Sequence, residues 1–240
     1  MTDAKFDVSA FDVKEFDRIL ACGLSFGIGD RGGRVCIEAA ICQVMGLPHG
    51  DDPGCVTESV RRFKIRLNDS QWSSPKARAK GLHDLGLAQL GSMGVVEDQE
   101  FTKRIVEKTI RVLIPALFRD VLKDEPKCLE AAKRCEDEGT VEAARNARDV
   151  ARGYNAAYAA DAAYAAAYAA YAAAAAAAYA AAAAAAAADA AYAADAADAA
   201  AAAAKSKYKP DYYLNLSAKL ALETLRELKS PGIVLLDGAR

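Results

Sequence analysis

The sequence predicts an all-α protein, and three observations carry that prediction. Apolar side chains recur three and four residues apart, as at Val13, Phe16 and Leu20, which is the spacing of one helix face. Capping residues stand before such patterns, and glycine or proline follows them. The stretch 152–204 is almost entirely alanine and contains no proline, so it favours one very long helix.

The composition indicates a cytoplasmic protein with reduced thiols. The 240-residue chain has a formal net charge of -2, which provides no general basic field for nucleic acid. No two of its six cysteines have C-x-x-C spacing, and its start, MTDAKFDVSAFDVKEF, lacks the apolar core of a secretory signal. The alanine run contains no leucine, isoleucine, phenylalanine or valine, so we expect no membrane span.

The first helix is expected between Asp12 and Gly23, because Glu15 follows Asp12 at the spacing of a capping box. The second helix, 34–45, has apolar residues nearly all round it, which indicates a central, buried position. Glu38 lies within this second helix. An unpaired buried carboxylate is costly, so we expect it to find a partner or reach the surface.

The third and fourth helices are expected over 57–67 and from Ser74 to about residue 90. Ser74 followed by Pro75 is an N-cap followed by a proline at the first helical position. The basic run 61–66 on the third helix is interpreted as a solvated face, since acidic residues balance it elsewhere in the chain.

The rest of the chain continues the helical pattern. The stretch 98–123 has apolar residues at helical spacing, and Pro115 is expected to kink or split it. A short helix is expected over 126–138 and a last one over 216–229. The apolar residues 233–236 are expected to pack back onto the core.

The alanine-rich segment carries six of its tyrosines and aspartates on one stripe when it is read in heptads. With Asp161 at heptad position a, the other five residues of the stripe fall at a and d positions. No glycine or proline marks a turn between Tyr154 and Pro210, so a single long helix is favoured over a hairpin. The stripe predicts a contact face for another part of the chain, a second copy or an outside ligand. Its members are Asp161, Tyr164, Tyr168, Tyr171, Asp189 and Tyr192.

Cys36 is the sharpest candidate for chemistry. It follows a glycine-rich loop and is expected in the first turn of the second helix, where a helix N-terminus lowers the pKa of a thiol. With His49 as base and Asp51 as orienting carboxylate, it would complete a nucleophilic triad. A small core cysteine and a loop-capping histidine explain the same residues without chemistry, and this interpretation is preferred.

Three polar loops form the predicted binding surface: GIGDRGG (27–33), LPHGDDPG (47–54) and NDSQWSS (68–74). A small anionic ligand is one option, because helix N-termini and basic residues lie nearby in the sequence. Trp72 is expected to be part of the core more than a platform for a ligand. The candidate ligand-binding residues are Asp30, Arg31, Asp52, Asn68, Asp69, Trp72 and Ser73.

A metal site is considered and not predicted. His49, Asp51, Asp52 and Cys55 are of types that bind zinc, but their spacing matches no zinc motif. The sequence identifies no cofactor.

The blocks CIEAAICQVMGLPHGDDPGCV, RLNDSQWSSPKARAKGL and LAQLGS lie within 36–92 and resemble an uncharacterised family of bacterial and bacteriophage proteins. The alanine-rich segment and the closing helix that ends in SPG are similar to that family as well. The resemblance implies a phage or prophage accessory protein. It implies no activity and no catalytic residue.

The sequence therefore predicts a helical domain over 1–138, a long alanine-rich helix over 139–209, and a C-terminal helix and tail over 210–240. The favoured function is a non-enzymatic binding or interaction protein. The alternatives are a cysteine-dependent hydrolase or transferase using Cys36 and His49, and an oligomerising helical rod. The expected partners are a small anionic ligand, a protein or a second copy of the chain, without nucleic acid or membrane.

Overall fold

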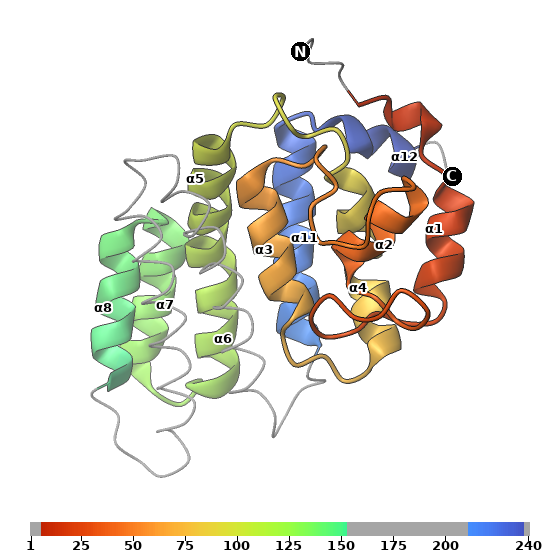
Figure 1. The fold of residues 1–240 in the computed structure, drawn as a ribbon. Coiled ribbons are helices and arrows are strands. Elements are labelled where there is room, and N and C mark those ends of the chain that lie inside the picture. The colour runs from red at the N-terminus through yellow and green to blue at the C-terminus, as the bar shows by residue number, and fades with distance from the viewer. Residues whose placement is uncertain (1–5, 153–210, 238–240) are drawn as a thin grey trace.

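The computed structural model describes residues 6–152 and 211–237, and these form the predicted all-α fold (Figure 1). Within these two ranges there is no sheet; an isolated β-bridge joins Gly29 to Val35 inside a loop. The predicted stripe from Asp161 to Tyr192, and with it most of the predicted long helix, lies outside the described residues.

The described residues form α-helices with short 3-10 and π segments among them. In chain order they are η1 (Val8–Ala10), α1 (Val13–Leu20), α2 (Ile37–Val44), α3 (Glu58–Asn68), α4 (Pro75–Ala88), α5 (Asp98–Lys108), η2 (Thr109–Leu113), α6 (Ile114–Val121), α7 (Pro126–Glu138), α8 (Val141–Arg152), α11 (Tyr212–Glu227), η4 (Pro231–Ile233) and α12 (Val234–Asp237). None of these helices is both long and apolar enough to cross a membrane.

Local capping signals set the helix starts. The Asp12 carboxylate accepts a hydrogen bond from the main-chain N–H of Glu15 at 3.0 Å, as capping residues do. Ser74 caps α4 in the same way. The start of α2 differs from the prediction, because Cys36 is its N-cap and the residues before it are extended. The bridge between the two sides of the preceding loop holds them in that conformation.

Near Pro115, where the sequence predicts a kink or split, the helical stretch 98–123 changes to a π-helical turn and stays continuous. The five residues of η2 lie between α5 and α6, and Pro115 is in the first turn of α6. Proline has no N–H to donate, and its ring collides with the carbonyl one turn earlier in a regular helix. The wider π turn gives the ring room without breaking the rod.

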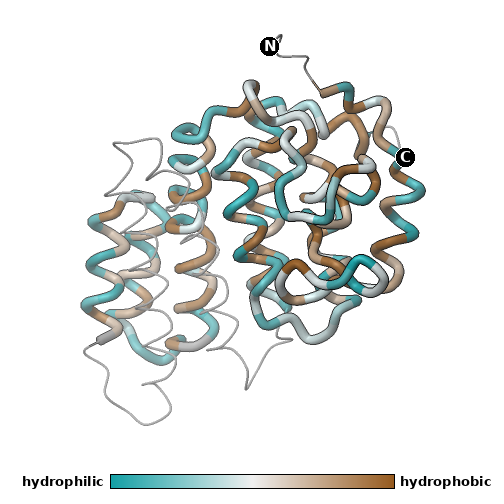
Figure 2. Tube along the Cα trace, viewed as in Figure 1, coloured by the Kyte–Doolittle hydropathy of each residue, from teal (hydrophilic) through white to brown (hydrophobic). Residues whose placement is uncertain are grey.

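One hydrophobic core runs through the described residues. In Figure 2, brown and teal alternate along most helices, so most of them have an apolar and a polar face, whereas α2 is buried on nearly all sides. The blue helix α11 packs against both α4 and α5, so it joins the helices α1 to α4 to the helices that follow them (Figure 1). It begins four residues earlier than predicted, with Tyr213 and Leu214 fully buried. α8, assigned by sequence to the long helix, packs on α7 through Ala144 and Ala147.

Arg111 closes the C-terminal end of α7. Its guanidinium donates hydrogen bonds of 2.8–2.9 Å to the last main-chain carbonyls of that helix, those of Glu136, Asp137 and Glu138. Gly139 follows with a φ of +62°, the left-handed conformation that glycine adopts at helix ends. A Cβ at this position would lie 2.4 Å from the Arg111 Nε.

The C-terminal residues pack back onto α4, as predicted. The Ser230 hydroxyl donates a hydrogen bond to the main-chain carbonyl of Ala88 at 2.6 Å. Gly232 lies so close to this helix that a Cβ would be 2.1 Å from the carbonyl oxygen of Leu87. Leu235 and Leu236 then pack on the core.

Candidate functional site

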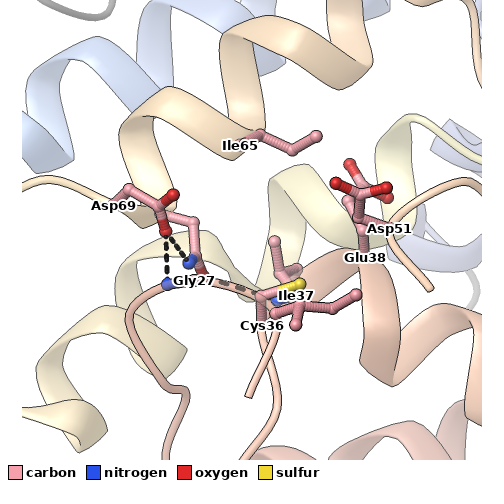
Figure 3. A pocket seen from close by; sticks show the side chains of 9 residues that line it. Gly27, Cys36, Ile37, Glu38, Asp51, Ile65 and Asp69 are labelled. Carbon is pink, nitrogen blue, oxygen red and sulfur yellow. Dashed lines mark hydrogen bonds between the residues drawn. The ribbon is translucent and has the colours of Figure 1, made fainter. Parts of the chain in front are cut away.

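The three loops that the sequence predicts as a binding surface converge in space. His49 joins the second loop to the first, because its Nε2 lies 3.0 Å from the main-chain oxygen of Gly29. Asp69 joins the third loop to the first, because its Oδ1 accepts a 2.8 Å hydrogen bond from the N–H of Gly27 (Figure 3). Residues more than 40 positions apart in the chain thus border one site.

Asn68 fastens the third loop to both ends of the first. Its side-chain amide donates to the main-chain oxygen of Ser25 at 3.0 Å. Its side-chain oxygen accepts a weaker bond, 3.4 Å long, from the N–H of Ile37 at the start of α2. A buried amide that is bonded on both sides fixes the orientation of the loop relative to the helix.

The loops enclose a small cavity of about 50 Å³ (Figure 3). Ile28 and Asp51 lie at its mouth, and the side chain of Asp51 is 50% exposed. The buried residues Cys36 and Glu38 lie at its inner end. Among the described residues that line it there are three carboxyl groups and no lysine or arginine. The lining residues are Gly27, Ile28, Cys36, Ile37, Glu38, Asp51, Ile65, Asn68 and Asp69.

Glu38 is fully buried and finds the partner that the sequence requires. The Nζ of Lys64, on α3, lies 3.0 Å from its Oε1, and neither side chain is exposed. Gln89 donates a 2.9 Å hydrogen bond from its side-chain amide to the Oε2. One charged pair and one amide therefore hold this carboxylate in the core.

The hydrogen bonding of this buried pair is incomplete. Within the described residues, neither the Oε1 of Glu38 nor the Nζ of Lys64 has a partner in hydrogen-bond geometry, so their contact is a charge attraction. Burial raises the pKa of Glu38 and lowers the pKa of Lys64, and the attraction between the two opposes both shifts. A buried oxygen without a directed bond retains the capacity to accept one from a ligand.

Cys36 is buried and its thiol is not activated. Burial raises its pKa to about 11, and the hydrogen bond that Sγ accepts from the N–H of Ala39 only partly opposes this. The direction is opposite to the expected lowering by a helix N-terminus, because the lost solvation of a thiolate outweighs the helix end. At neutral pH the thiol stays protonated and packs as a small apolar group.

The other two residues of the predicted triad have separate contacts. The main-chain oxygen of Gly29 can only accept, so the Nε2 of His49 carries a proton and serves to link two loops. Asp51 contacts Arg61 through its main-chain oxygen, at 3.2 Å, and its carboxylate, at 3.6 Å. No hydrogen bond joins Cys36, His49 and Asp51 in the part of the chain that the structure describes.

Only Asn68 and Asp69, among the seven predicted ligand-binding residues, line the cavity. The exposed residues of this set lie on the loops but outside the lining, and they are Asp30, Arg31 and Asp52.

The remaining two predicted ligand-binding residues stabilise the fold. Trp72 is 8% exposed and donates from its indole nitrogen to the carbonyl of Leu67 at 2.8 Å. Ser73 binds the carboxylate of Asp211 through its N–H, at 2.7 Å, and its hydroxyl. The predicted core role of Trp72 is therefore confirmed, and Ser73 ties the third loop to the start of α11.

No group of three or more histidine, cysteine, aspartate or glutamate side chains in residues 6–152 and 211–237 is arranged to hold a metal ion. The set considered from the sequence, His49, Asp51, Asp52 and Cys55, is therefore not gathered around one point.

Sequence reasoning missed Lys64 and Gln89 as parts of the site. Lys64 was assigned to a solvated basic face, whereas it is fully buried. A signal was present: Val60, Phe63, Lys64 and Leu67 have the i, i+3, i+4, i+7 spacing of one helix face. A lysine on the apolar face of a helix needs a buried counter-charge. The sequence already predicts that Glu38, within the buried second helix, needs a partner.

Comparisons with protein-family models, curated proteins and solved structures give no match to this chain. The geometry and charge of the cavity are therefore the basis for assigning a function.

Proposed function

We propose that this protein is a non-enzymatic binding protein whose cavity between the three loops takes a small, positively charged group. The observation that carries the proposal is the lining of the cavity, which contains three carboxyl groups and, among the described lining residues, no cationic side chain. A phage or prophage accessory role, expected from the sequence resemblance, is part of the same proposal.

The volume of the cavity supports a primary ammonium group as the occupant. A cavity must have a volume of roughly 10–15 Å³ to hold one water molecule. The cavity of about 50 Å³ therefore holds one ammonium head group with few water molecules. Pockets for drug-sized ligands have roughly 300–1,000 Å³. The cavity therefore suits the end of a ligand, and the rest of that ligand would remain outside.

The charges around the cavity favour a cation over the small anion considered from the sequence. Asp51 at the mouth and Glu38 at the inner end both present carboxylate oxygens, and Asp69 lies across from them in the view of Figure 3. Arg61 and Lys64 partly balance these charges, but neither belongs to the lining. An ammonium group would donate up to three hydrogen bonds to such acceptors.

The Oε1 of Glu38 supports the proposal independently of the count of acidic residues. It belongs to a fully buried residue of the lining, and its contact with the Nζ of Lys64, at 3.0 Å, is ionic and lacks full hydrogen-bond geometry within the described residues. A carboxylate oxygen that is ion-paired in this way can still accept a directed hydrogen bond from a second donor. An ammonium group in the cavity would supply such a donor.

The cysteine-dependent alternative has less support from the site. Cys36 has a pKa of about 11, and His49 is engaged with the carbonyl of Gly29. A nucleophilic thiol requires the thiolate form near neutral pH. The binding proposal uses the cavity without requiring that form.

Titration with methylammonium chloride, followed by amide NMR spectra at constant ionic strength, tests the proposal. We expect saturable shifts at the N–H groups of Gly27, Ile28 and Asp51, with a Kd in roughly the millimolar range. Asp51→Asn should weaken binding about ten-fold, because the asparagine oxygen can still accept a hydrogen bond from the ammonium but no longer with the help of a negative charge.

Asp52→Asn is the matched control. Asp52 is the exposed neighbour, and its Oδ1 accepts the N–H of Gly54, which an asparagine oxygen can also do. This variant should bind methylammonium as the wild type does. Shifts that do not saturate, or equal losses in the two variants, would remove the proposal.

A further inference from the structure

We infer that the charged group bound by the cavity is the ammonium of a lysine side chain that a partner protein presents next to an apolar residue. The inference rests on the proposed function. It adds a partner class, and it uses two exposed apolar side chains at the start of the first loop, those of Phe26 and Ile28.

Two exposed apolar residues flank Gly27, a residue of the cavity lining. Phe26 is 69% exposed and Ile28 is 41% exposed, and Ile28 also lines the cavity. Scattered exposed apolar residues are common on protein surfaces. These two stand on either side of a lining residue of an acidic cavity, so apolar surface is available to a ligand that extends out of the cavity.

The first loop is held firmly enough to present these side chains. The bridge between Gly29 and Val35 and the main-chain hydrogen bonds from Ser25 N–H to Val35 and from Cys36 N–H to Ile28 hold it against the start of α2. Gly29 has a φ of +73°, and a Cβ there would lie 2.2 Å from the main-chain oxygen of Arg34. Asp69 holds the N–H of Gly27. Such pre-ordering lowers the entropic cost of binding a partner.

Lysine fits this arrangement better than a free amine or an arginine. The cavity has room for a compact head group only. Lysine carries its charge as a point on a flexible four-carbon stem, whereas the guanidinium of arginine is a wider, planar group. The stem would cross the mouth along Ile28, and an apolar neighbour in the partner would cover Phe26.

Isothermal titration of the full chain with three probes tests the inference. The probes are methylammonium, acetyl-Gly-Lys-Gly-amide and acetyl-Leu-Lys-Leu-amide. We expect the leucine peptide to bind about ten-fold more tightly than the glycine peptide, since part of an apolar side chain becomes buried. The glycine peptide should bind about as methylammonium does.

Phe26→Ser separates the inference from the proposed function. Phe26 does not line the cavity, so methylammonium binding should be unchanged while the advantage of the leucine peptide is lost. Phe26→Leu should retain most of that advantage. Val234→Ser, at a residue of α12 that is 62% exposed, is the matched control and should alter neither affinity.

Each outcome decides one of the two ideas. If methylammonium binds and the two peptides have equal affinities, the inference is wrong and the proposed function stands. If the leucine peptide binds more tightly but Phe26→Ser leaves its advantage intact, the inference is also wrong. If methylammonium does not bind in the cavity, both are wrong.

Discussion

The Nζ of Lys64 lies 3.0 Å from the Oε1 of Glu38, and neither side chain has any exposure to solvent. Because one charge is on α3 and the other on α2, the pair ties together two helices that border the cavity. Removing one partner leaves an uncompensated buried charge, which is much more costly than replacing both.

Lys64→Met should therefore lower the free energy of unfolding by about 3–5 kcal/mol. The double variant Glu38→Gln with Lys64→Met should recover most of this loss, because no buried charge remains and Gln89 keeps a partner. Urea unfolding at neutral pH measures both. Lys80→Met, at an exposed position of α4, is the control and should change stability by less than about 0.5 kcal/mol. A loss below about 1 kcal/mol for Lys64→Met contradicts the argument.

His83, on α4, contacts two carboxylates, and one of them joins α4 to α1. Its Nε2 lies 2.8 Å from Asp17, on α1, and its Nδ1 lies 2.7 Å from Asp84, next to it on α4. Ionised carboxylates only accept hydrogen bonds, so the two contacts together favour the imidazolium form, in which both ring nitrogens carry protons. Burial by itself lowers the pKa of His83, but the bonds to Asp84 and Asp17 outweigh it and the pKa is raised.

The raised pKa of His83 predicts a loss of stability towards alkaline pH. Its contribution is fully present below the unfolded-state pKa of histidine and is lost as the pH rises through the higher folded-state value. The wild type should therefore lose more stability than His83→Gln between about pH 6 and about pH 9. Urea midpoints across this range measure the difference. Parallel curves for the two proteins would show that the ring is not preferentially charged in the folded state.

Gly139→Ala should destabilise the junction of α7 and α8. The φ of +62° disfavours a side chain, and the new Cβ would displace Arg111 from the end of α7. We expect a loss of about 2–4 kcal/mol in the free energy of unfolding.

Gly94→Ala separates the two causes of that loss. Gly94 has a similar φ of +70°, but nothing lies within 4 Å of a Cβ built there. It should show only the backbone cost, about 1–2 kcal/mol. Equal losses for Gly139→Ala and Gly94→Ala would mean that the contact with Arg111 contributes nothing.

The thiols should differ sharply in reactivity. Cys22 is the exposed cysteine, and the other five are buried. With its pKa at about 11, Cys36 is a thiolate in only about one molecule in a thousand at pH 8. Alkylation of the native protein should show one fast thiol, which Cys22→Ser removes and Cys36→Ser does not. A fast phase that disappears in Cys36→Ser would support the cysteine-dependent alternative.

Signals within a few residues of each other predicted the helices well. Asp12, Ser74 and Pro115 act on the N–H groups and carbonyls of their own turn, so their effects are visible in a short window of sequence. The start of α11 was placed too late, because Tyr213 and its neighbours are helical through burial against other elements more than through local pattern.

The sequence by itself determined the all-α class, the helix ends that carry a local capping signal and the need of Glu38 for a partner, since these follow from local geometry and from the cost of burying a charge. Only the tertiary structure decided that this partner is Lys64, that three loops meet around one acidic cavity, and that the pKa of Cys36 rises. Each of these depends on how segments that are distant in the sequence pack together and remove side chains from water. The residues next to a side chain in the sequence do not reveal that packing.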